Sequence, residues 1–123
     1  MPSRHTLSNG LTVVSERLEG APVAAFQVWV RAGAADEGPQ EVGLAHLHEH
    51  MLFKGTERFG LGEIARTVEG HGGDINAFTT SDQTVYHVQM ASRHARVGLE
   101  VLADAIRRST FDASELTKEI EVV

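Results

Sequence analysis

The sequence contains no cysteine among its 123 residues. This absence excludes disulfides, iron–sulfur clusters and thiolate zinc ligands, although a cysteine-free chain can fold in any compartment. No apolar stretch approaches the roughly 18 residues that a membrane-spanning helix needs. No apolar run follows a basic start at the N-terminus, so the sequence predicts no signal peptide. We therefore expect a cytoplasmic protein with no membrane partner.

Positive charge is also scarce. The chain has 11 Lys and Arg residues against 17 Asp and Glu residues, which gives a formal net charge of −6. The adjacent pair Arg107 and Arg108 stands alone, and no basic stripe typical of nucleic-acid binding is present. We therefore expect no nucleic-acid partner. Apolar residues make up 41% of the chain, which is enough for the packed core of a globular domain.

Residue periodicity predicts an α+β fold. The pair Asn9-Gly10 suits a tight hairpin turn because both residues tolerate positive φ, so we expect a short strand on either side of it. Other strands are predicted from period-two alternation at Ala24–Arg31, Asp74–Thr79 and Gln83–Gln89. Helices are predicted over Glu41–Phe53, from Leu61 to the glycines at 70–73, after a cap at Ser92, and from a capping box formed by Asp112 and Glu115.

The resulting order is β-β-β-α-α-β-β-α-α. Hairpins and runs of strands favour a largely antiparallel sheet with helices packed on one side. No helix-ending signal follows the last predicted helix before Val123. We therefore expect residues 1–123 to be a fragment of a larger domain.

The segment from His46 to His50 contains the pattern H-x-x-E-H. On a helix, His46 and His50 are about 40° apart around the axis, so both imidazoles can reach one metal ion. Glu49 lies on the flank of the same face. Two neutral imidazoles suit Zn²⁺, which lowers the pKa of its bound water, and a nearby carboxylate can accept the proton of that water. This pattern is the inverted zinc-peptidase motif.

The residues alone leave alternatives open. The same five letters could form a polar helix face whose histidines make ordinary hydrogen bonds. His48 points about 200° away from His46, so we expect it near the core side of the helix rather than at the metal. A tetrahedral site also needs a third protein ligand. Candidates within the chain are several carboxylates and the histidines at His5, His71, His87 and His94, and the sequence does not choose among them.

A family resemblance covers essentially the whole chain. It is carried by the segments Leu7–Leu11, Val28–Gly33, Gly43–Thr56 and Gly72–Thr80, followed by Asp82 and Tyr86. In order and spacing these segments resemble the insulinase, pitrilysin and mitochondrial processing peptidase family. The resemblance implies that residues 1–123 are the N-terminal part of a single zinc metallopeptidase domain. It implies that His46 and His50 bind Zn²⁺ and that Glu49 is the general base of a zinc-dependent endopeptidase acting on peptides or unfolded segments.

The resemblance also assigns residues outside the motif. It places the third ligand about 76 residues after His50, at position 126, which lies outside the chain. It makes Glu119 a supporting carboxylate about two helical turns before that ligand, although a solvated surface carboxylate is the alternative. It places Asn76 and Ala77 on an edge strand that pairs with an extended substrate, whereas Asn76 could simply end a strand.

The sequence departs from the family in two respects. His48 replaces a residue that is usually apolar, and the chain is roughly half of one family domain. Family members enclose substrate with two such domains or with a homologous partner subunit, so we expect a missing C-terminal half or a dimer. The 123-residue fragment alone is expected to be inactive.

Two other functions share parts of this sequence pattern. S-ribosylhomocysteinase shares H-x-x-E-H but completes its site with cysteine, which this chain lacks. A non-catalytic structural or substrate-binding homologue would have lost a ligand or the base, whereas His46, Glu49 and His50 are all present.

Overall fold

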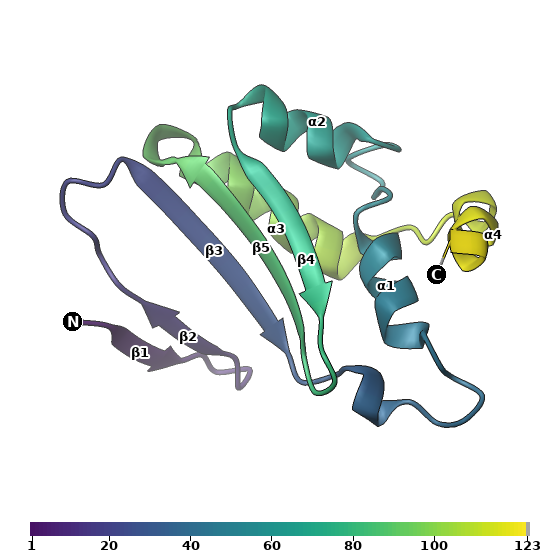
Figure 1. Cartoon of the computed structure of the whole chain (residues 1–123). Coiled ribbons are helices and arrows are strands. Elements are labelled where there is room, and N and C mark those ends of the chain that lie inside the picture. Colours follow the sequence, from purple (N-terminus) through teal and green to yellow (C-terminus); the bar gives the residue numbers. More distant parts are fainter. Residues whose placement is uncertain (123) are drawn as a thin grey trace.

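The computed structural model describes residues 1–122 as an antiparallel α+β structure (Figure 1). In chain order its strands are β1 (Ser3–Thr6), β2 (Thr12–Ser15), β3 (Val23–Val30), β4 (Asp74–Thr79) and β5 (Thr84–Ala91). Its helices are α1 (Leu44–Leu52), α2 (Glu63–Gly70), α3 (Ala95–Arg108) and α4 (Ala113–Val122), with short 3₁₀ turns η1 (Ala34–Asp36) and η2 (Ser92–His94). Apart from the 3₁₀ turns, this is the predicted order.

The strands form two separate antiparallel sheets. β1 pairs with β2 as a hairpin, and Gly10 in its turn has a φ of 92°. The second sheet has the order β3-β5-β4, so the central strand β5 is flanked by two strands that precede it in the sequence. This order leaves β4 at one edge of the sheet, where its outer side faces α1 (Figure 1).

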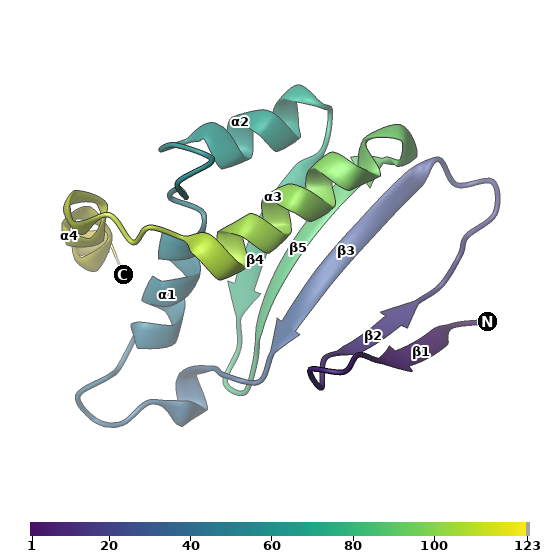
Figure 2. The same cartoon turned by 180° about the vertical axis from the view of Figure 1, so that it is seen from behind.

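Helices α2 and α3 cover one face of the three-stranded sheet, and Figure 2 shows α3 running along that face. The core lies between them. Its buried side chains come from α1, α2, β5 and α3, and they are Leu52, Ile64, Val68, Tyr86, Val88, Met90, Val101, Leu102 and Ala105. Burying such side chains stabilises the fold by about 1.5–3 kcal/mol for each large aliphatic one. The prediction of helices packed on one side of an antiparallel sheet is confirmed.

Three predicted helix starts are wrong by a few residues. α1 begins at Leu44 rather than Glu41, and α2 begins at Glu63 rather than Leu61. Both follow a glycine with positive φ, which a right-handed helix cannot include. Ser92 does not cap α3; it opens the turn η2, and the helix begins three residues later.

Helices α1 and α4 pack against each other beyond the edge strand β4 (Figure 1). His50 and Glu119, 69 positions apart in the sequence, are thereby brought together beside the sheet edge. Among residues 1–122, no helix combines the length and the apolar character needed to cross a membrane.

Candidate metal centre

The two motif histidines converge on one point. Because His46 and His50 are one helical turn apart on α1, their rings meet edge to face with centroids 4.4 Å apart. Their Nε2 atoms are 2.9 Å from each other. Two nitrogens that each lie 2.0–2.1 Å from a tetrahedral zinc ion are roughly 3.3 Å apart. A shift of a few tenths of an ångström would therefore let both rings bind one ion.

Glu49 completes the cluster. Ligand atoms of His46, Glu49 and His50 all lie within 4.8 Å of one another, and no other group of three such residues occurs in the part of the chain that the structure describes. Glu49 is half-buried, and its Oε2 accepts a hydrogen bond from the Thr79 hydroxyl at the end of β4. The carboxylate of α1 is thereby attached to the edge strand of the sheet.

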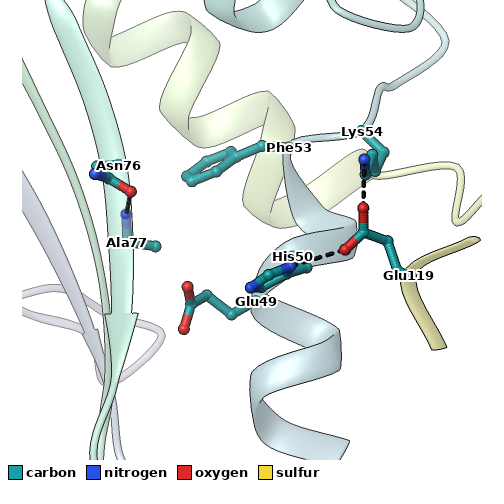
Figure 3. A pocket seen from close by; sticks show the side chains of 7 residues that line it. All are labelled: Glu49, His50, Phe53, Lys54, Asn76, Ala77 and Glu119. Atoms are coloured by element: carbon teal, nitrogen blue, oxygen red, sulfur yellow. Dashed lines mark hydrogen bonds and ion pairs between the residues drawn. The ribbon is translucent and has the colours of Figure 1, made fainter. Parts of the chain in front are cut away.

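Glu119 fixes the orientation of His50. The His50 Nδ1 lies 2.8 Å from Glu119 Oε2, and the Lys54 ammonium lies 2.6 Å from Glu119 Oε1 (Figure 3). The hydrogen bond from Lys54, and after it that from His50, lowers the pKa of Glu119. An ionised carboxylate can only accept, so Nδ1 of His50 carries the proton and Nε2 of a neutral ring carries the lone pair. This is the tautomer that a metal at the His46–His50 pair requires.

An open cleft of about 280 Å³ lies between α1 and the outer edge of β4. It is lined by Glu49, His50, Phe53, Lys54, Asn76, Ala77 and Glu119 (Figure 3). In this cleft the backbone amide of Ala77 donates to Oδ1 of Asn76 at 2.8 Å. The site residues inferred from the sequence therefore lie around one cleft, except that His46 is not among its lining residues.

The other histidines lie elsewhere. His71 and His94 contact each other at a centroid distance of 4.8 Å, His87 lies beside Phe78, and His5 is on β1. None of these four histidines belongs to the cluster of His46, Glu49 and His50 in the part of the chain that the structure describes. The structure therefore supports none of them as the third metal ligand.

His48 lies outside the cluster of His46, Glu49 and His50, as predicted, and reaches towards the core. Its Nδ1 lies 3.4 Å from the hydroxyl of the core residue Tyr86, and its ring lies against Phe111. It nevertheless stays exposed instead of packing on the core side of α1.

Burial, and after it the charge of Glu49, raises the pKa of Tyr86 to about 12.

Comparison with known sequences decides the family. The family model described as insulinase, peptidase family M16, matches residues 12–123. The chain belongs to this family. A zinc protease of Bacillus subtilis, YmxG, is 41% identical over 123 residues, which cover 100% of this chain and 30% of that protein. A probable mitochondrial-processing peptidase subunit beta of Arabidopsis thaliana is 36% identical over 118 residues, or 96% of this chain and 22% of that protein.

Solved structures agree with this M16 assignment. A protease from Helicobacter pylori superposes with a TM-score of 0.93 and 32% identity, covering 99% of this chain and 30% of that one. A Pseudomonas fluorescens protein described as an inactive M16 peptidase domain superposes with a TM-score of 0.90. At 23% identity, the second likeness concerns the fold alone. The M16 chain described here thus spans less than a third of the length of these relatives.

Sequence reasoning missed two residues that line the cleft, Phe53 and Lys54, and a third, Thr79, that donates a hydrogen bond to Glu49. Thr79 and Ala77 are two residues apart on β4 and therefore on one face, a signal that could have linked Thr79 to the site. Lys54 stands four residues after His50, which is one helical turn. Phe53 lines the cleft beside it, and nothing in the local pattern distinguishes it from a core residue.

Proposed function

We propose that residues 1–123 are the N-terminal part of a single zinc metallopeptidase domain that hydrolyses peptides or unfolded polypeptide segments. The observation that carries this proposal is the convergence of His46 and His50, with Nε2 atoms 2.9 Å apart and Glu49 beside them. In this proposal the two imidazoles hold the zinc ion. A third protein ligand at position 126 is part of the same proposal.

Zinc, when bound, supplies a Lewis acid that polarises a peptide carbonyl and lowers the pKa of water. Glu49 then acts as the general base: its carboxylate accepts a proton from the attacking water and passes it to the leaving amine. The Thr79 hydroxyl donates to Oε2 of Glu49 and so holds the carboxylate in place, with acceptor sites remaining on both oxygens for the proton.

The edge strand β4 is proposed to bind the substrate. An extended peptide can add to a sheet edge through backbone hydrogen bonds, which make little demand on sequence. Ala77 offers its amide to the cleft, and the Asn76 side chain that now occupies this amide would move aside or bond to the peptide. The remainder of the chain or a homologous partner subunit is proposed to close the cleft from the other side.

The proposal is tested by zinc content and cleavage of an unstructured peptide, measured on the full-length protein and on Glu49→Gln. Glu69→Gln is the matched control, since Glu69 is exposed on α2. We expect about one zinc in all three proteins, and a loss of cleavage by roughly 10²- to 10⁴-fold in Glu49→Gln alone. Zinc binding without cleavage in wild type would favour a non-catalytic homologue, and absence of zinc would contradict the roles of His46 and His50.

A further inference from the structure

Lys54 stands between the metal centre and α4. Its side chain is 29% exposed, and its ammonium lies 2.6 Å from Glu119 Oε1 and 3.7 Å from Glu115 Oε2. These two glutamates are one helical turn apart on α4 and keep only 7% and 9% of their surface exposed. Two buried like charges at this spacing destabilise a helix unless a cation balances them. Lys54 provides that cation from the end of α1.

The two oxygens of Glu119 have different partners. Oε1 accepts from Lys54 and Oε2 accepts from His50 Nδ1 (Figure 3). A carboxylate bonded at both oxygens has one orientation, whereas a carboxylate held by His50 alone can rotate away from the ring. The position of the His50 ring therefore depends on a side chain that does not touch it.

Lys118 provides an internal comparison. Its ammonium lies 3.2 Å from Glu115 Oε1, and 70% of its side chain is exposed. Among the described contacts it has none with Glu119. Lys54 and Lys118 thus both place a positive charge beside α4, but of the two it is Lys54 that contacts Glu119, the hydrogen-bond partner of His50.

We propose that Lys54 is a positioning residue of the metal centre: its ammonium fixes the Glu119 carboxylate, which fixes the ring and tautomer of His50. The consequence for catalysis rests on the proposed zinc peptidase function. The placement of His50 itself does not, because it follows from the side-chain contacts of His50 with Glu119 and of Glu119 with Lys54.

The first test is zinc affinity of the full-length protein, measured by competition with a chromophoric chelator. We expect Lys54→Met to weaken zinc binding by roughly 10- to 100-fold, the range for partners that orient a ligand. We expect Lys118→Met, with the same change of net charge, to change it by less than about twofold, and Lys54→Arg to recover most of the loss. Equal effects of Lys54→Met and Lys118→Met would overturn the proposal.

The second test needs no metal. Nitrogen-15 NMR of the imidazole rings distinguishes Nδ1–H from Nε2–H. In wild type and in Lys118→Met we expect His50 to hold its proton on Nδ1, and in Lys54→Met to populate both tautomers, with unchanged circular dichroism showing that the fold is retained. An unchanged tautomer in a folded Lys54→Met protein would overturn the proposal. If wild type binds no zinc, the proposed function fails, and this measurement alone decides the role of Lys54.

Discussion

His50 and Glu119 are 69 positions apart in the sequence, yet His50 Nδ1 donates to Glu119 Oε2 at 2.8 Å. The bond joins α1 to α4 and fixes which ring nitrogen of His50 faces His46. Packing of the two helices is therefore a condition for the proposed metal centre.

Replacement of Glu119 by Gln should weaken zinc binding by roughly 10- to 100-fold, because the neutral amide holds the ring less strongly and leaves Lys54 without its main partner. Glu121→Gln makes the same chemical change on the exposed side of α4 and should leave the affinity unchanged. Competition with a chelator measures the zinc dissociation constants of both variants. Equal constants would show that Glu119 does not support zinc binding.

Replacement of Thr79 by Val should lower kcat by roughly 10- to 100-fold, because Glu49 loses the hydrogen bond that holds its carboxylate in place. KM and zinc content should stay within about twofold of wild type. Thr79→Ser keeps the hydroxyl and should recover most of the rate. Steady-state kinetics on an unstructured peptide provide the comparison, and equal losses in the Val and Ser variants would argue against this role.

Replacement of Ala77 by Pro should lower kcat/KM for peptide cleavage by roughly 3- to 10-fold, mainly through KM, since one backbone hydrogen bond contributes about 0.5–1.5 kcal/mol. Pro is tolerated on an edge strand, so the fold should be kept. Ala77→Ser retains the amide and should cleave like wild type. A wild-type KM in the Pro variant would show that substrate does not pair at this position.

The pKa of Tyr86, about 12, predicts how stability depends on alkaline pH. The folded state keeps the phenol neutral where the unfolded state loses its proton, so this contribution is complete below pH 10.0 and is lost as the pH rises towards 12. An absorbance titration at the tyrosinate band, as the difference between wild type and Tyr86→Phe, measures the pKa. A midpoint near 10 would mean that the hydroxyl is not buried.

Local sequence patterns predicted most of the fold because each element has a clear period. The hairpin followed from Asn9-Gly10, and the strand Asp74–Thr79 was predicted with its observed limits. The predicted starts of α1 and α2 lie too early in the sequence. Gly43 and Gly62 have positive φ and stay outside the helices, and this conformation is visible only once the preceding loop is placed.

The candidate site was predictable only in part. His46, Glu49 and His50 share a helix, so their convergence follows from spacing. One of the two hydrogen bonds of the predicted capping box at Asp112 forms. Asp112 Oδ1 accepts a hydrogen bond from the Glu115 amide, but the Glu115 side chain contacts Lys54 and Lys118 and not the Asp112 backbone. The pair with Lys118 is a local one, three residues along the helix, whereas the pair with Lys54 is tertiary and follows from no local rule.

The hydrogen bond from the Ala77 amide to Asn76 has a consequence for solubility. An edge strand that binds peptides, as proposed for β4, is also a template for another copy of the protein, and unpaired edges promote aggregation. Here the donor at the centre of the edge is occupied by the side chain next to it, while α1 stands across the cleft. In the proposed function a substrate would replace this internal bond, and until then the Ala77 donor is not offered to a neighbouring copy.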